Sequence, residues 1–250
     1  MEKKENGELL PLIKPSTGTF TLPTRIAKVL PETDVLVVGG GPAGLGAALG
    51  AAEAGAKVTL AERYGFLGGN ATAGSVLTFG SYYTSAKMPS PTKQSELTLF
   101  PGDQGDGKPI IGGVLARLIE RLVKAAGAFA PSAKTRFMVP FDPEVFKFEA
   151  LEMLDAAGVE FLFHAFAGAI VDIDGVRGVV FETKSGPLVV KAKVIVDCTG
   201  DGNIAAFAGA LFEVGGKKDN LVQPMAIMFL MEGFKIEKFR DYVQANPDQW

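Results

Sequence analysis

The feature that most constrains the fold is the stretch from Val35 to Arg63, which has the pattern of a strand, a glycine turn, a helix and a second strand. Residues 34–38 are a near-continuous apolar run, as expected of a parallel strand that is covered on both faces. A helix rich in alanine and glycine is predicted over residues 43–54, followed by a second strand over residues 57–61. This β-α-β unit predicts an α/β domain with a Rossmann-like parallel sheet.

The turn between the first strand and the helix has the pattern G-x-G-x-x-G, made by Gly39, Gly41 and Gly44. The first glycine permits a tight bend, the second lets a pyrophosphate approach the backbone, and the third lets the helix pack close to the strand. Pro42 and Ala43 open the helix, whose free N–H groups favour phosphates. Glu62 ends the second strand about 20 residues later, where an acid accepts hydrogen bonds from ribose hydroxyls. We therefore predict a dinucleotide site here.

A glycine-rich loop follows the pair Glu62–Arg63 and contains Gly68, Gly69, Asn70, Ala71 and Thr72. Backbone without side chains, beside small polar groups, suits close approach to a ligand. The segment resembles the second conserved segment of flavoproteins with two dinucleotide-binding domains. It is most similar to bacterial FAD-dependent oxidoreductases of the glutathione-reductase-like superfamily. The resemblance implies FAD as the cofactor, with this loop and Arg63 along the pyrophosphate and the isoalloxazine edge.

A third segment extends the resemblance. Residues 194–198 form an apolar strand, the turn Thr199-Gly200-Asp201-Gly202 follows, and a small-residue helix is predicted over residues 203–210. The resembled family has a comparable turn near the flavin, which implies that Thr199, Gly200 and Asp201 contact the cofactor. The resemblance runs from about residue 34 to residue 234.

The middle of the chain supplies the other expected elements. Residues 81–109 read as a long loop, residues 114–126 and 142–157 as helices, and residues 159–163 as a strand of the main sheet. Alternation with turns at Asp174-Gly175 and Ser185-Gly186 predicts a three-stranded antiparallel meander over residues 169–194. Such a meander in place of a helical crossover is typical of the resembled superfamily. The resemblance also implies that backbone near Ala167 borders the adenine.

Two single residues are candidates for reactive groups. His164 is the only histidine, and its position after an apolar strand favours packing or capping over acid–base work. Cys198 is the only cysteine, and a small cysteine at a strand end is usually inert. No metal site is predicted from one histidine and one cysteine, and no catalytic residue is identified.

The composition limits the kinds of binding partner and the cellular compartment that we expect. The formal net charge of −3 supplies no basic field for nucleic acid or an anionic membrane surface. No apolar helix candidate is long enough to span a bilayer, and a lone cysteine requires no oxidising compartment. We therefore expect a cytoplasmic protein with a small-molecule substrate and neither nucleic-acid binding nor a membrane span.

The expected domains are an N-terminal extension (1–33), an FAD-binding domain (34–222) and the beginning of a substrate or partner domain (223–250). Residues 223–231 are predicted to form a strand that opens the second domain, followed by a helix over residues 236–245. In the resembled family a late segment returns to contact the flavin ribityl chain, and we expect this chain to lack it. Alternatively, Gly200-Asp201 is that ribityl contact and the chain is a complete short flavoprotein. An unpaired apolar strand predicts a homo-oligomer or a second polypeptide that completes the enzyme.

The function predicted from these features is an FAD-dependent oxidoreductase, or its FAD-binding subunit. Its flavin would accept hydride or electrons from an unidentified small molecule. Two alternatives remain at this point: an enzyme resembling thiazole synthases that uses NAD as its substrate, and a degenerate, non-catalytic partner subunit.

Overall fold

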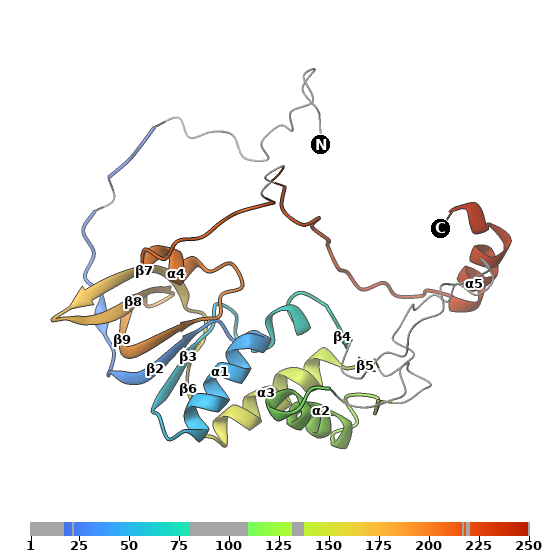
Figure 1. Cartoon of the computed structure of the whole chain (residues 1–250), viewed down its shortest axis with the longest axis horizontal. Coiled ribbons are helices and arrows are strands. Elements are labelled where there is room, and N and C mark those ends of the chain that lie inside the picture. The colour runs from blue at the N-terminus through green and yellow to red at the C-terminus, as the bar shows by residue number, and fades with distance from the viewer. Residues whose placement is uncertain are drawn as a thin grey trace.

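The computed structural model describes residues 18–21, 23–80, 110–131, 138–216, 218 and 221–249. Three helices cover one face of a parallel sheet, and antiparallel strands lie on the other side (Figure 1). The last part of the chain runs away from this sandwich (Figure 1). The loop predicted over residues 81–109 lies outside the described residues.

The parallel part of the sheet has the order β6-β3-β2-β9, formed by β6 (Glu160–Leu162), β3 (Val58–Ala61), β2 (Thr33–Val38) and β9 (Gly186–Asp197). In register, Val35 of β2 lies between Val58 and Val194. Every residue of β3 is buried, including the polar Thr59, as expected of a strand covered on both faces. The Rossmann-like fold predicted from the sequence is confirmed.

The antiparallel part is formed by β7 (Phe166–Ile173), β8 (Val176–Thr183) and the first half of β9. The meander is present as predicted, but its last strand does not end at residue 194. It continues as the single strand β9 into the parallel sheet and pairs there with β2. A short strand, β1 (Lys28–Val29), lies parallel to β9 inside the expected N-terminal extension.

The helical layer contains α1 (Pro42–Glu53), α2 (Gly113–Lys124) and α3 (Pro143–Asp155) (Figure 1). Asp142 caps α3, because its side chain accepts hydrogen bonds from the N–H of Glu144 at 2.7 Å and of Val145 at 3.3 Å. The core between this layer and the sheet contains Leu45, Leu49, Val37, Leu60, Leu122, Phe146 and Leu154.

Short elements complete the sandwich. A 3₁₀ turn, η1 (Gly69–Ala71), lies in the loop after β3, and β4 (Thr78–Phe79) pairs with β5 (Val139–Pro140). Helix α4 (Asn203–Phe207) follows β9 and is shorter than the predicted helix over residues 203–210.

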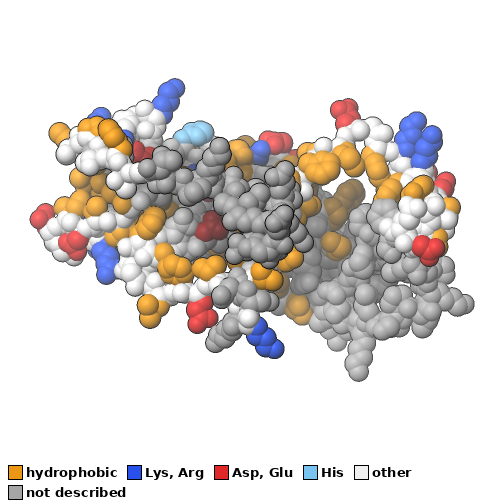
Figure 2. All heavy atoms as spheres, turned by 90° about the horizontal axis from the view of Figure 1, so that it is seen from above, with side chains coloured by type: hydrophobic (Ala, Val, Ile, Leu, Met, Phe, Trp, Pro, Cys, Tyr) orange, Lys and Arg blue, Asp and Glu red, His pale blue; other side chains and the backbone are white. Residues whose placement is uncertain are grey.

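The C-terminal segment, defined here as residues 211–249, differs from its prediction. Residues 223–231 form no strand, and their large side chains are exposed, with Ile227 at 89%. A β-strand exists only where a neighbouring strand accepts its backbone hydrogen bonds, and no described strand lies beside this stretch. The predicted helix is present as α5 (Ile236–Ala245), followed by the 3₁₀ turn η4 (Pro247–Gln249). Exposed apolar side chains are visible toward the α5 end of the molecule (Figure 2).

Candidate functional site

A cleft of about 700 Å³ opens at the carboxyl ends of β2, β3 and β9. This edge of a doubly wound sheet is where ligands bind in such folds. The lining comes from the turn before α1, from the residues after β3, from the start of β7 and from the turn after β9. Four segments that are far apart in the sequence therefore meet at one place.

The glycine turn is packed so tightly that side chains cannot be added on its inner side. Gly39 has φ +105°, and its N–H donates to the Ala61 carbonyl at 2.8 Å. A Cβ on Gly44 would collide with the Gly39 carbonyl oxygen, which explains how α1 sits so close to β2. A Cβ on Gly41, in contrast, would meet nothing nearer than the Gly69 Cα at 3.8 Å. Gly41 therefore presents bare backbone to the cleft, next to the N-terminus of α1.

Glu62 is buried at the end of β3, with only 6% of its surface exposed. One carboxylate oxygen accepts the Gly40 N–H at 2.6 Å, and the other accepts the Tyr64 N–H at 2.9 Å. These charge-assisted bonds fix the carboxylate on the cleft wall. Because a carboxylate has about four acceptor positions, it can also accept hydrogen bonds from the hydroxyls of a ligand.

The loop after β3 is tied to the glycine turn. The Gly68 N–H donates to the Gly40 carbonyl at 2.8 Å, and the Thr72 hydroxyl donates to the Leu67 carbonyl at 2.8 Å. A Cβ on Gly69 would come within 2.9 Å of the Gly41 Cα, so the two glycines allow the loop and the turn to touch. The loop and the turn thus form one continuous wall of the cleft.

Asp197 organises the opposite wall, at the end of β9. Its carboxylate accepts the Thr199 N–H and hydroxyl at 3.0 and 2.8 Å and the Ala205 N–H at 2.8 Å. Burial raises the pKa of this carboxyl, but the hydrogen bonds from Ala205 and Thr199 together outweigh it, so the pKa lies below its ordinary value. Asp197 thereby holds the turn Thr199–Gly202 against α4.

The two candidate reactive residues, Cys198 and His164, have ordinary surroundings. Burial, with a smaller effect from Asp197, raises the pKa of the Cys198 thiol, which keeps it in the protonated, poorly nucleophilic form. His164 is exposed, its N–H donates to the Tyr64 carbonyl at 3.2 Å, and its ring packs against Gly65.

Most residues predicted to contact the cofactor line the cleft: Gly39, Gly41, Pro42, Ala43, Glu62, Arg63, Gly69, Asn70, Ala167, Thr199, Gly200 and Asp201. The other predicted residues, Gly44, Gly68, Ala71 and Thr72, are not part of the lining; they hold the turn and the loop in place from behind. The lining also contains residues that were not predicted to contact the cofactor: Val38, Ala61, Tyr64, Ala73, Gly74, Ala165, Phe166, Asp197, Cys198, Gly202 and Asn203. Two of these residues lie next to predicted ones in the sequence: Tyr64 follows Arg63, and Gly202 ends the turn that contains Thr199.

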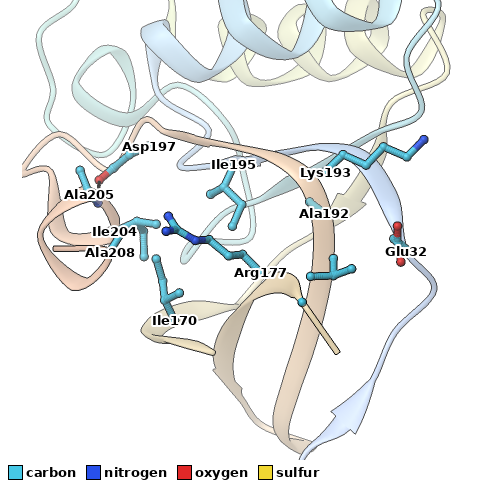
Figure 3. A pocket seen from close by; sticks show the side chains of 12 residues that line it. Glu32, Ile170, Arg177, Ala192, Lys193, Ile195, Asp197, Ile204, Ala205 and Ala208 are labelled. Carbon is cyan, nitrogen blue, oxygen red and sulfur yellow. Dashed lines mark hydrogen bonds between the residues drawn. The ribbon is translucent and has the colours of Figure 1, made fainter. Parts of the chain in front are cut away.

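A second cavity, of about 520 Å³, lies between the meander, β9 and α4. Its lining is mainly aliphatic, and Arg177 extends across it toward Ile204 (Figure 3). Asp197 lines both this cavity and the cleft.

No group of His, Cys, Asp and Glu side chains in the described ranges gathers in a way that could hold a metal ion. None of the described helices is both long and apolar enough to cross a bilayer.

Comparison with known proteins decides the family. The model of a family described as FAD dependent oxidoreductase matches residues 34–250. The chain belongs to this family. Its cofactor is FAD, and the cleft of this member fits the ADP half of that molecule: bare backbone at Gly41, a helix N-terminus beside it and a fixed carboxylate at Glu62. No curated protein sequence matches the chain.

Solved structures give fold-level likeness. A geranylgeranyl bacteriochlorophyll reductase-like protein from Thermoplasma acidophilum is 17% identical, with a TM-score of 0.46 over 79% of this chain and 44% of its own. A flavoprotein/dehydrogenase from Cytophaga hutchinsonii is also 17% identical, with a TM-score of 0.45 over 75% and 44%. THI4 from Thermovibrio ammonificans is 21% identical, with a TM-score of 0.45 over 75% and 67%. The chain thus spans less than half the length of the first two.

Proposed function

We propose that the cleft binds FAD and that the chain is the FAD-binding part of an oxidoreductase that acts on a small molecule. The proposal depends on the arrangement of Gly41 and Glu62 on one wall of the cleft. Gly41 leaves room for a pyrophosphate beside the start of α1, and Glu62 offers a fixed carboxylate to ribose hydroxyls. FAD, when bound, supplies the capacity to accept a hydride or electrons.

The rest of the cleft supports the other half of the cofactor. The two walls that face each other across the glycine turn both carry groups that can form hydrogen bonds. These groups belong to Asn70, Gly74, Asp201 and Asn203. They offer amide, carboxylate and backbone groups for hydrogen bonds to a polar chain or ring edge. In our proposal these residues orient the flavin end. Neither the substrate nor an acid–base residue is assigned.

The C-terminal segment supports a proposal about partners. Apolar side chains from Met225 to Met231 are exposed on both sides of an extended chain, which proteins avoid in their functional state. We propose that a second copy, or another polypeptide, covers this segment in a cytoplasmic enzyme. Light scattering checks this: replacing Ile227 and Phe229 by lysine should abolish association of the purified chain. A wild-type chain that is monomeric at all concentrations and alone binds FAD tightly would contradict the need for a partner.

The cofactor proposal is tested by titrating the purified chain with FAD and following flavin fluorescence. A Gly41→Val variant should lose binding, because the side chain would fill the space beside α1, yet it should melt near the wild-type temperature. Gly50→Val is the matched control: Gly50 also lies open, on the exposed part of α1 away from the cleft. Titration with NAD in place of FAD separates a flavin site from a general dinucleotide site. Equal FAD uptake by the Gly41→Val chain would contradict the proposal.

A further inference from the structure

The second half of β9 lies at an edge of the sheet. Along its first half β9 pairs with β8, and the last residue paired there is Lys191. From Ala192 onward β9 pairs with β2 on one side, and no strand in the described part of the chain pairs with the other side. We call residues 192–197 the open edge. A strand edge of this kind is a template on which another strand can form.

The backbone of the open edge is directed so that it can receive a strand. The Cys198 N–H donates to the Val38 carbonyl at 2.8 Å, toward β2. Backbone groups of alternate residues point to opposite sides of a strand, so those of Ile195 and Asp197 point away from β2. Val194 is 53% exposed, whereas strands of a parallel sheet are normally buried on both faces. The open edge therefore offers both hydrogen-bonding groups and apolar surface.

The second cavity, of about 520 Å³, borders the open edge. Four residues of the open edge line it, and the Ile195 side chain points into it from β9 (Figure 3). Aliphatic side chains of β7 and α4, among them Ile170 and Ile204, form other parts of its wall. The cavity has room for more than one large apolar side chain, since about 150 Å³ already accepts a benzene-sized group. A strand added to the open edge would direct the side chains of one of its faces into this cavity.

Residues 223–231, with the sequence QPMAIMFLM, have the composition of a strand that would fit this edge. A near-continuous apolar run is typical of a parallel strand that is covered on both faces, and the strands beside β9 in this part of the sheet are parallel. The stretch is also longer than the open edge, so it can pair along the whole of it. Its exposed large side chains are Met225, Ile227, Met228, Phe229, Leu230 and Met231.

We propose that residues 223–231 of a second copy form a strand on the open edge of β9, and that the exchange is reciprocal. This inference rests on the proposed function, since it takes a second copy as the partner that covers the C-terminal segment. Reciprocal exchange closes the pair with two-fold symmetry, and each copy then has its edge paired and its apolar stretch covered. A buried phenylalanine contributes about 150–250 Å². Two stretches with six large apolar side chains each therefore bury on the order of 1,600 Å², the area of a standard stable interface.

The first test places a charge on the open edge and measures dimerisation of the full 250-residue chain by analytical ultracentrifugation. Val194→Lys should weaken dimerisation by at least about tenfold, because a lysine on a strand edge opposes the addition of a strand. Val29→Lys is the matched control. Val29 is also a strand valine that is 53% exposed, but it lies in β1, on the side of β9 away from the open edge. The Val29→Lys chain should dimerise like the wild type.

Mixing two variants separates this arrangement from packing of the two apolar stretches against each other. The Ile227→Lys/Phe229→Lys chain keeps its open edge but cannot donate a strand. The Val194→Lys chain keeps its apolar stretch but cannot receive one. A one-to-one mixture should therefore associate more strongly than either variant alone, because one donor and one receiving edge are then present. If the two stretches packed against each other, the mixture would gain nothing.

The outcomes separate the inference from the proposals on which it rests. A wild-type chain that stays monomeric at all concentrations would overturn the inference and leave another polypeptide as the partner. A wild-type dimer that Val194→Lys does not weaken, or that Val29→Lys weakens equally, would overturn the open edge alone. Hydrogen exchange on the wild type gives the same test if Val194→Lys melts early. Residues 192–197 should exchange more slowly in the concentrated dimer than in the dilute chain, and equal exchange would overturn the inference. FAD titration of the wild type tests the cofactor proposal separately.

Discussion

The sandwich (the described residues between 33 and 207) and the C-terminal segment use similar apolar residues with opposite results. Val37 and Leu60 are fully buried, whereas Ile227 is 89% exposed. None of the described residues beyond Ile204 is buried. The backbone of β9 pairs with β8 along its first half and with β2 along its second half, while residues 223–231 belong to no strand. The difference teaches that an apolar run specifies a strand only when the same chain supplies the strands beside it.

The largest expected contrast is in stability. Leu60→Ala in the sandwich should lower the free energy of unfolding by about 2–5 kcal/mol, because it leaves a cavity in a packed core. Leu230→Ala in the C-terminal segment should change it by less than about 0.5 kcal/mol in the dilute chain, since Leu230 is exposed. Urea denaturation measures both. A comparable loss in the two variants would show that residue 230 is buried in solution.

A smaller effect is expected on cofactor affinity. Glu62→Gln should weaken FAD binding by about 1.5–3 kcal/mol, because it removes the charge that would accept the ribose hydroxyls. Glu160→Gln, at the exposed first position of β6, is the control and should bind FAD like the wild type. Fluorescence titration distinguishes the two. If both variants bind FAD equally well, Glu62 is not a cofactor residue.

The smallest expected effect is the pH dependence that Asp197 contributes. Its pKa is lower in the folded chain than in the unfolded chain. Its contribution to stability is therefore present above the unfolded pKa of about 3.9, and is lost as pH falls through the folded pKa. Asp197→Asn should be less stable than the wild type at neutral pH, and the difference should shrink on acidification. Urea midpoints measured between about pH 6 and about pH 3 check this. A difference that stays constant would mean that Asp197 does not titrate with folding.

Local signals predicted the sandwich well. The β2-α1-β3 unit was found because strand, glycine turn, helix and acid all lie within one short stretch. Alternation predicts the meander but ends its last strand at residue 194, because no local feature marks where β9 changes partners. The strand β1 has only two residues, too few to show the alternation that predicts a strand. The prediction of a strand over residues 223–231 was wrong for the opposite reason. The apolar pattern there is strong, but the described chain has no strand that pairs with it.

The candidate site shows the same limit. Gly41 and Glu62 were located because a motif fixes their spacing. Gly44 and Thr72 belong to the same motifs yet support the wall from behind. Phe166 and Asn203 line the cleft because β7 and α4 pack against each other. That packing joins residues far apart in the sequence, so no local pattern predicts it.

Hydrogen exchange with and without saturating FAD tests the central claim most directly, because it reports on both regions in one measurement. We expect FAD to slow exchange at residues 39–44, 62–74 and 197–203, which form the walls of the cleft. Residues 221–249 should exchange at the same rate with and without FAD. Protection confined to residues 221–249, or no change at residues 39–44, would contradict the account.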